Sequence, residues 1–371
     1  MANRIDGLRA PLFVSWQLTR DCDLCCLHCC TDSAPGKRLP DELSVDEALQ
    51  VAADIARNEV PYVMLCGGEP LVVPHFYQVA EALGGAGVQL KIETNGQRFD
   101  AAVGDRLARL PVRSIQVSLD GDTQEIYEKQ RPGASLDKAH AACRAARAAD
   151  LPLEVTFAPT RLNIHEAGAV IQRARALGAF RFNTGQLMRI GTAARLWGRL
   201  EPSPAQYREF RDVLDRQARV LGGEMELCYS PFTMGDGLRG SLEDPPATLL
   251  VLPNGWVKIA AALPHVCADL RRKGLGEAWQ AYCDAWREES VLDAVRRAIA
   301  GEEHHVEANT WRLPALDGGK MSDLKLNLQQ KKSEQEARTE KVDAAKKLDW
   351  ETPKMEDVSE QVMAQPYIRF T

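Results

Sequence analysis

The sequence predicts an α/β fold in which parallel strands alternate with helices and curve into part of a (β/α)6 barrel. Three observations predict this class: apolar runs of strand length recur in the first half of the chain, amphipathic segments separate them, and turn residues follow the strand ends. The expected strands lie within residues 12–18, 62–65, 89–94, 114–119, 153–157 and 180–184. In such a barrel, functional side chains gather at the carboxyl ends of the strands.

The segments between these strands have the apolar spacing of helices. The first one begins with a capping box, because Ser44 is followed three residues later by Glu47, and its helix should run to about Asn58. Further helices are predicted at residues 76–86, 101–109, 136–149 and 165–177. This regular alternation of strand and helix predicts a parallel sheet.

The loop after the first predicted strand holds five of the ten cysteines of the chain. Cys22, Cys26 and Cys29 have the spacing C-x3-C-x2-C. Three thiolates from one short loop can hold three irons of a [4Fe–4S] cluster, because soft sulfur ligands suit such clusters, and the fourth iron then stays open. A zinc site is the alternative, because the loop also contains the C-x2-C pairs Cys22/Cys25 and Cys26/Cys29.

Glycine-containing turns follow the next strands. Gly67-Gly68-Glu69-Pro70 comes just after the second strand, and its glycines let the backbone approach a ligand closely. Thr94-Asn95-Gly96 follows the third strand, and Ser118-Leu119-Asp120-Gly121 follows the fourth. Each segment alone also fits an ordinary turn, so their common order along the chain is the stronger observation.

Together these motifs resemble the radical S-adenosylmethionine (SAM) superfamily, whose signature is this cysteine spacing after the first strand of a partial βα barrel. The resemblance implies that Cys22, Cys26 and Cys29 hold a [4Fe–4S] cluster, whose open iron binds SAM. Reductive cleavage of SAM then yields a 5′-deoxyadenosyl radical that takes a hydrogen atom from the substrate. The residues implied to bind SAM are Gly67, Gly68, Glu69, Pro70, Asn95, Ser118, Asp120 and Arg131. An electron donor such as flavodoxin or ferredoxin is implied as a partner.

The segment after residue 190 has a different pattern. A strand, a turn at Pro253-Asn254-Gly255 and a returning strand predict a hairpin. With residues 274–279, this hairpin resembles the small α+β SPASM/twitch extension of peptide-modifying radical SAM enzymes, which normally carries cysteines for auxiliary clusters. The stretch 257–262 lacks the expected cysteine, and this part of the chain retains only Cys228, Cys267 and Cys283. An extension without auxiliary clusters is therefore expected, and a single poorly specified site is the alternative.

Residues 321–371 form a third region, reached through residues 316–320. The chain there is polar and repetitive to about Lys347, which predicts disorder or a weak helix, and aromatic residues then return. The region resembles a small ribosomal precursor peptide, with Trp350, Tyr367 and Arg369 as candidate substrate residues and a carbon–carbon cross-link near Tyr367 as a candidate product. A charged tail with a docking end is the alternative, and a separate peptide-recognition chaperone is a further expected partner.

Composition limits the remaining choices. The chain has 371 residues, is 45% hydrophobic and has a net charge of −6, which permits a sizeable core and argues against nucleic acid as a partner. It has no apolar run of about 18 residues and no signal-peptide pattern, so a cytoplasmic protein with reduced thiols and no membrane contact is expected.

The overall prediction is a radical SAM maturase of a precursor peptide, related to the enzymes that modify precursors of pyrroloquinoline quinone and mycofactocin. Its predicted regions are a barrel at 10–190, an extension at 191–315, a linker at 316–320 and a tail at 321–371. Two alternatives remain: a radical SAM enzyme acting on a small molecule such as a tetrapyrrole, and a metal-stabilised peptide-binding scaffold. The peptide-like tail favours a peptide substrate over a small molecule.

Overall fold

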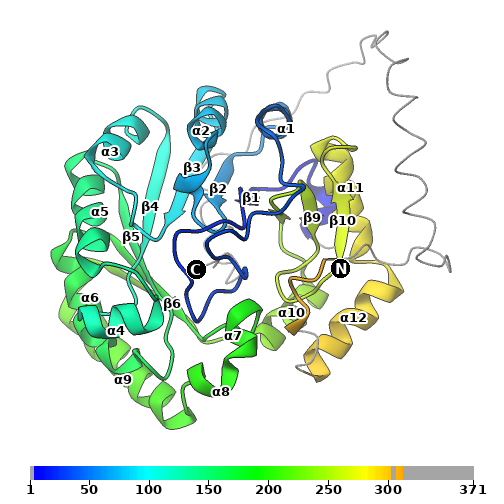
Figure 1. Cartoon of the computed structure of the whole chain (residues 1–371). Helices are drawn as coiled ribbons and strands as arrows, with labels where there is room; N and C mark the ends of the chain where they lie inside the picture. The colour runs from blue at the N-terminus through cyan, green and yellow to red at the C-terminus, as the bar shows by residue number, and fades with distance from the viewer. Residues whose placement is uncertain (1–3, 302–305, 312–371) are drawn as a thin grey trace, which may run out of the picture.

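The computed structural model describes residues 4–301 and 306–311, and in this part of the chain ten strands form one curved sheet (Figure 1). The strand order is β10-β9-β8-β1-β2-β3-β4-β5-β6-β7. Seven consecutive strands of this order run parallel to one another: β1 (Phe13–Gln17), β2 (Tyr62–Cys66), β3 (Gln89–Thr94), β4 (Val112–Ser118), β5 (Leu153–Phe157), β6 (Arg181–Gly185) and β7 (Glu226–Ser230). Their carboxyl ends therefore meet at one edge. The six predicted strands are confirmed, and the sheet does not close into a barrel in the described part.

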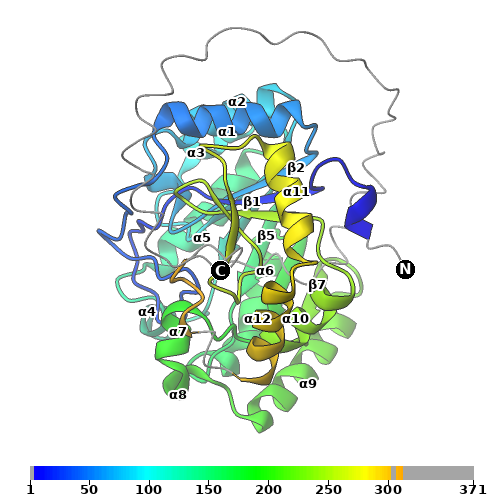
Figure 2. The same cartoon turned by 90° about the vertical axis from the view of Figure 1, so that its right-hand side faces the viewer.

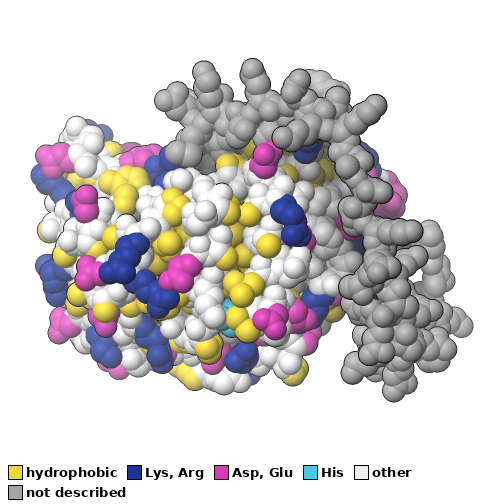
Figure 3. Space-filling model, turned by 90° about the horizontal axis from the view of Figure 1, so that it is seen from above, with side chains coloured by type: hydrophobic (Ala, Val, Ile, Leu, Met, Phe, Trp, Pro, Cys, Tyr) yellow, Lys and Arg dark blue, Asp and Glu magenta, His cyan; other side chains and the backbone are white. Residues whose placement is uncertain are grey.

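The predicted helices form an outer layer around these strands. They are α1 (Val45–Arg57), α2 (Phe76–Gly85), α3 (Ala101–Leu107), α5 (Leu136–Ala148) and α6 (Ala167–Ala176). The capping box of α1 is present, because Ser44 accepts a hydrogen bond from the Glu47 amide and the Glu47 carboxylate accepts one from the Ser44 amide. Figure 3 looks down on the layer that contains α1 and α2, and the coloured residues of that face mix charges of both signs with apolar side chains.

Other described helices were not predicted as separate elements. They are the short α4 (Gln124–Gln130), α7 (Gly191–Arg195), α8 (Trp197–Leu200) and α9 (Pro204–Leu221). Helix α9 continues the outer layer beside α6 (Figure 1).

The two faces of the strands differ in polarity. The face toward the helices is apolar, with the fully buried residues Val63, Leu65, Leu90 and Ile92. The opposite face carries polar side chains that bind one another across strands. Lys91 Nζ lies 2.7 Å from Glu154 Oε2, and this contact bridges β3 and β5 across the intervening β4. Burial alone would raise the pKa of Glu154, but Lys91 holds it at about 2. The face of the strands that points away from the helices is therefore polar.

The segment beyond residue 190 continues the same sheet at both of its sides. Strand β7 pairs with β6, and β8 (Thr248–Val251) pairs in parallel with β1. The predicted hairpin is confirmed by the antiparallel pairing of β8 with β9 (Trp256–Lys258), and β10 (Val266–Asp269) follows. Its turn includes Gly255 at φ +80°, a left-handed conformation that favours glycine.

Three helices complete this part of the chain. They are α10 (Met234–Glu243), α11 (Leu275–Ala285) and α12 (Glu289–Ala300), and α10 packs against α12 (Figure 2). The predicted boundary at residue 190 stays a prediction, and the predicted tail at 321–371 lies outside the described residues. Within the described ranges, no helix combines the length and apolar character needed to cross a bilayer.

Candidate functional site

The cysteine loop, residues 21–33, follows β1 and crosses the middle of the molecule in Figure 1. The turn after β2 holds the start of this loop through its backbone. The Gly68 amide donates to the Thr19 carbonyl at 2.7 Å, and the Glu69 amide donates to the Asp21 carbonyl at 3.0 Å. The sheet topology thus brings together two motifs that lie far apart in the sequence.

The glycines of this turn have a structural reason in addition to the expected approach to a ligand, which stays a prediction. A Cβ atom added to Gly68 would lie 1.9 Å from the Asp21 carbonyl oxygen, and Gly67 has φ +140°. Any side chain at position 68 would therefore displace the cysteine loop. Gly68 therefore permits a close approach of two protein backbones.

One cavity at the strand ends contains most of the predicted site residues. Eight of them line it: Cys22, Cys26, Cys29, Gly67, Gly68, Asn95, Ser118 and Arg131. The predicted SAM contacts Glu69, Pro70 and Asp120 are not among the residues that line this cavity. Thr31, Ser33 and Glu93 also line it, and the sequence motifs gave no signal for them.

Glu69 lies beneath this cavity and orders the residues around it. Its carboxylate is fully buried and accepts hydrogen bonds from Thr94 Oγ1 at 2.9 Å, the Asn95 amide at 2.8 Å and the Leu71 amide at 3.1 Å. Burial raises the pKa of Glu69 to about 7, because these donors only partly offset the loss of water. The Asn95 side chain in turn donates to Asp23 at 2.7 Å and lies 3.7 Å from Cys22 Sγ.

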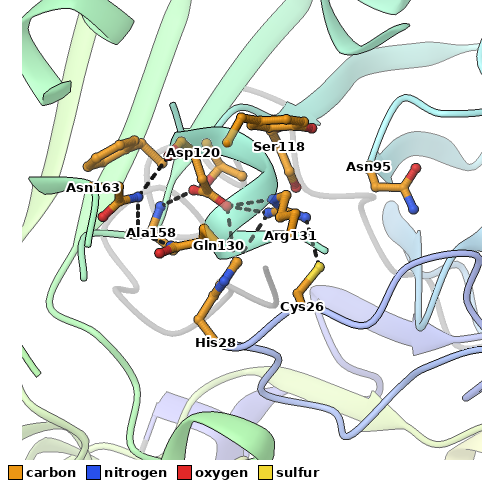
Figure 4. Close-up of polar contacts among 12 residues, drawn as sticks. Cys26, His28, Asn95, Ser118, Asp120, Gln130, Arg131, Ala158 and Asn163 are labelled. Atoms are coloured by element: carbon orange, nitrogen blue, oxygen red, sulfur yellow. Dashed lines mark hydrogen bonds and ion pairs between the residues drawn. The ribbon is translucent and has the colours of Figure 1, made fainter. Parts of the chain in front are cut away.

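A buried ion-pair network lies on the other side of the cavity (Figure 4). Asp120 Oδ2 accepts from Arg131 Nε at 2.6 Å and lies 3.1 Å from His28 Nε2, while Asp120 Oδ1 accepts from the Ala158 amide at 2.7 Å. Burial opposes ionisation, but Arg131 and His28 hold the pKa of Asp120 at about 2. Arg131 also donates to Cys26 Sγ at 3.5 Å. Asp120 therefore positions Arg131 against a cysteine of the loop.

Sequence reasoning missed the remaining members of this network. Asn163 Nδ2 donates to the carbonyl oxygens of Asp120 at 2.9 Å and Ala158 at 3.0 Å, and Gln130 Nε2 donates to the same Ala158 carbonyl at 3.0 Å. The only sequence signal was that Ala158 follows β5. Its partners are brought together by the tertiary fold.

The donor set is compatible with an iron–sulfur cluster. The described residues contain no group of three His, Cys, Asp or Glu side chains that could hold one ion. A cluster makes no such demand, because each thiolate binds a different iron. Burial raises the pKa of the Cys22 thiol, and it raises the pKa of the Cys26 thiol to about 12 although Arg131 acts in the opposite direction. Loading would therefore release protons from buried thiols.

The cysteines of the extension are placed differently. Cys228 lies on β7 and Cys267 on β10, the two ends of the strand order, and Cys283 lies on α11. None of the ten cysteines, all of which lie in the described part of the chain, forms a disulfide. The prediction that the extension holds no auxiliary cluster stays a prediction.

Comparison with known proteins identifies the region that contains this cavity. Residues 16–172 match the Radical SAM superfamily. The chain contains a radical SAM domain. Members of this family are enzymes that use SAM and an iron–sulfur cluster. The matched range includes the cysteine loop, the turn after β2, Asn95, Ser118 and Arg131.

Two curated relatives illustrate the similarity. Mycofactocin maturase MftC of Mycobacterium tuberculosis is 32% identical over 236 residues, which cover 63% of this chain and 60% of that protein. AdoMet-dependent heme synthase of Methanosarcina barkeri is 30% identical over 203 residues, covering 53% of this chain and 56% of that protein. The matches thus span about 60% of the length of these relatives.

Solved structures confirm the fold class. SuiB of Streptococcus suis, solved with bound S-adenosylmethionine, superposes with a TM-score of 0.61 at 13% identity, covering 78% of this chain and 68% of SuiB. A second SuiB structure, bound to the precursor peptide SuiA, gives the same TM-score. At this identity the likeness concerns the fold alone.

Proposed function

We propose that this chain is a radical SAM enzyme that modifies a ribosomally made precursor peptide. The cavity that gathers three cysteines with four strand-end residues and Arg131, at the end of α4, carries the enzymatic part of this proposal. The peptide part is supported by relatives that are named maturases and by the SuiB structure with its precursor peptide. A chain with ten cysteines, three of them proposed cluster ligands, is proposed to work in a reducing compartment such as the cytoplasm, where thiols stay available for binding.

The residues that would hold the cofactors line one space. Cys22, Cys26 and Cys29 would bind a [4Fe–4S] cluster, and Gly67, Gly68, Asn95, Ser118 and Arg131 would contact SAM. When bound, these groups supply reductive cleavage of SAM to a radical that abstracts hydrogen. Asp120 would act through Arg131, and Glu69 through the Asn95 backbone. A flavodoxin- or ferredoxin-type donor, and a separate peptide chaperone, would complete the system.

The protein holds a positive charge, that of Arg131, next to the cysteines. Arg131 places a guanidinium against Cys26, and its own orientation is set by the buried Asp120 carboxylate. A fixed cation favours a negatively charged thiolate ligand set. The chain also covers the back of the loop, because Ala308 is fully buried and Asn309 Nδ2 donates to the Cys30 carbonyl and the Asp32 carboxylate, both at 2.8 Å. This segment therefore packs against the loop at Cys30 and Asp32.

The same segment supports the chain's own tail as the substrate. Trp311 directly precedes residues 312–371, and its ring centroid lies 5.4 Å from the Arg20 guanidinium, next to the cysteine loop. A tail that starts here has a high effective concentration at the cavity. The candidate residues Trp350, Tyr367 and Arg369 lie outside the described part, and a cross-link of Tyr367 to a nearby residue is the proposed product.

Anaerobic reconstitution followed by mass spectrometry tests this function. With SAM and a reductant, we expect 5′-deoxyadenosine and a loss of two hydrogens from the tail, because a new carbon–carbon bond replaces two bonds to hydrogen. One hydrogen would end in 5′-deoxyadenosine, and the other would leave as a proton while its electron passes back to the flavodoxin- or ferredoxin-type carrier. Tyr367→Ala should abolish that loss, whereas Trp350→Phe, which keeps an aromatic ring at the other end of the segment, should retain it.

Two outcomes contradict the proposal in different ways. If 5′-deoxyadenosine forms while the tail keeps its mass and fragmentation pattern, the enzyme acts on another molecule. The similarity to a heme synthase makes a tetrapyrrole the first substrate to try in that case. If iron and SAM do not bind at all, the metal-stabilised peptide scaffold takes its place.

A further inference from the structure

A second cavity, the lysine cavity, lies between the hairpin strands and helices α10 and α11. Its walls are largely apolar, and the main apolar contributors are Met234, Leu238, Leu250, Ile259, Tyr282 and Trp286. Residues 260–262 are three alanines, and all of them line it. They stand in the stretch where the resemblance to SPASM/twitch extensions predicts a cysteine. Their small side chains leave space and add no metal ligand.

Lys258 is the cationic side chain of this cavity. It lies on β9, is 3% exposed, and its Nζ donates to the Ala261 carbonyl at 2.7 Å. An ammonium group carries three donors, and a buried one is stable only with an anion or several acceptors. Among the described residues, no carboxylate forms an ion pair with Lys258. The site therefore has capacity for an anionic partner.

The charged groups around Lys258 come from the cysteine loop and its approach, and they largely offset one another. Asp32 and the Cys30 thiol favour the ammonium form, whereas Arg20 opposes it. Burial dominates and lowers the pKa of Lys258 to about 7. On the cavity side, the Tyr282 hydroxyl donates instead to the Pro246 carbonyl at 2.9 Å. Near neutral pH, both the ammonium and the neutral amine form of Lys258 are therefore accessible.

The lysine cavity lies next to the candidate functional site. Between them is a strand-end cavity at β5, β6 and β7, lined among others by His28, Cys30, Leu187 and Phe232. His28 also lines the cavity with the three cysteines, while Met234 and Ala261 line both the strand-end cavity and the lysine cavity. A ligand bound near the cysteines could therefore extend into the space beside Lys258.

We propose that the lysine cavity binds a carboxylate carried on an apolar group, with Lys258 as its cationic partner. The inference deepens the proposed function, on which it rests for the link to the substrate, by assigning that substrate a carboxylate. An incoming carboxylate would replace the missing counter-ion, and the apolar walls would bury the carbon skeleton next to it. A carboxylate of the peptide or of a small organic acid has the required chemistry.

Calorimetry on the reconstituted full chain tests this binding. The probe is 3-phenylpropionate, and its neutral amide is the matched control ligand. We expect the acid to bind at least about tenfold more tightly than the amide, because only the acid pairs with the ammonium group. At pH 8 the acid should also take up protons, seen as a dependence of the binding heat on the buffer. Equal affinities for acid and amide would overturn the proposal.

Variants place the effect at Lys258. Lys258→Met should remove the preference for the acid and the proton uptake, whereas Lys273→Met, at an exposed lysine before α11, should keep both. If Lys258→Met binds the acid as well as the parent does, the proposal fails. The comparison of acid with amide on the unchanged chain remains decisive even if the variant does not fold.

A last variant identifies the source of the carboxylate. The five acidic residues between positions 349 and 360 are changed together to their amides. Tighter binding of the probe would mean that the tail's own carboxylates compete for the cavity, which supports a peptide ligand. Unchanged binding would support a small organic acid. The mass assay of the tail is independent of this result, so the two proposals can fail separately.

Discussion

The cysteine loop and the β8–β9 hairpin form two contrasting regions of one sheet. The loop follows β1, and β8 of the hairpin pairs in parallel with β1. The loop supplies three cysteines to one cavity, whereas the hairpin supplies a lysine and alanines to another. The difference shows that the strands of the sheet do not depend on the metal ligands expected beside them. The hairpin keeps its strands and turn without the cysteine expected within residues 257–262.

Removing cysteines from each region should give the largest contrast. Changing Cys22, Cys26 and Cys29 to alanine should abolish iron binding, because the three thiolates are the proposed ligands. Changing Cys228, Cys267 and Cys283 should leave about four irons per chain, the content of one cluster. Iron analysis and electron paramagnetic resonance after anaerobic reconstitution measure both. Loss of iron in the second variant, or about eight irons in the parent, would show that the extension also holds a cluster.

Two ion pairs, one beside the cysteine loop and one at the surface after α11, should differ in how much they stabilise the fold. Arg131→Met leaves the fully buried Asp120 carboxylate without its main partner, and we expect it to lower the free energy of unfolding by about 3–5 kcal/mol. Arg287→Met breaks a pair with Asp6 at the surface near α11, where we expect less than about 1 kcal/mol. Urea unfolding of the iron-free proteins compares them. Similar losses in both variants would mean that burial does not distinguish the two pairs.

Glu69, in the turn that holds the cysteine loop, and Lys258, on the hairpin, should give pH dependences of stability with opposite signs. Glu69 has a raised pKa, so its contribution to stability is full below its ordinary value of 4.5 and is lost as the pH rises through about 7. Lys258 has a lowered pKa, so its contribution is full above its ordinary value of 10.5 and is lost as the pH falls through about 7. At about 1.4 kcal/mol per pH unit between the ordinary and the folded-state pKa, the effect should reach at most roughly 3 kcal/mol for Glu69 and roughly 5 kcal/mol for Lys258.

Matched variants separate these two responses. Glu69→Gln should flatten the dependence between pH 5 and 7, and Lys258→Met the dependence between pH 7 and 10. Urea unfolding at pH 5, 7 and 9 gives the three free energies. A parent protein whose pH dependence is unchanged by either variant would contradict both assignments.

The sequence predicted the regular part of the fold well because its signals are local. Apolar runs gave β1 to β6, and the capping box at Ser44 gave α1 within one residue. Helix α4 was missed because it shares the connection between β4 and β5 with α5, which is longer and buries five residues. The pairing of β7 and β8 with the two sides of the barrel strands could not be read from the chain, because it depends on partners far away in sequence.

The candidate site was predictable as a set of motifs but not as a geometry. The cysteine spacing and the strand-end turns pointed to residues that line one cavity. The role of Asp120 depends on Arg131 and on His28, which is 103 residues from Arg131, and no local pattern reveals that contact. The same holds for Gly68, whose neighbour is the Asp21 backbone. Burial of Lys258 likewise emerges only when α10, α11 and the hairpin enclose it.

The parallel pairing of β1 with β8 has a consequence for how the molecule is made. Phe13 stands opposite Thr248, so the strand that leads into the cysteine loop cannot complete its hydrogen bonds until most of the chain has been synthesised. Contacts of such long sequence separation slow folding. Until β8 arrives, one side of β1 is an open edge, and open edges pair with other chains. Pairing with β8 thus covers the open edge of β1 and should reduce aggregation. A chain truncated before residue 248 should therefore be insoluble, even though it keeps every cysteine of the loop.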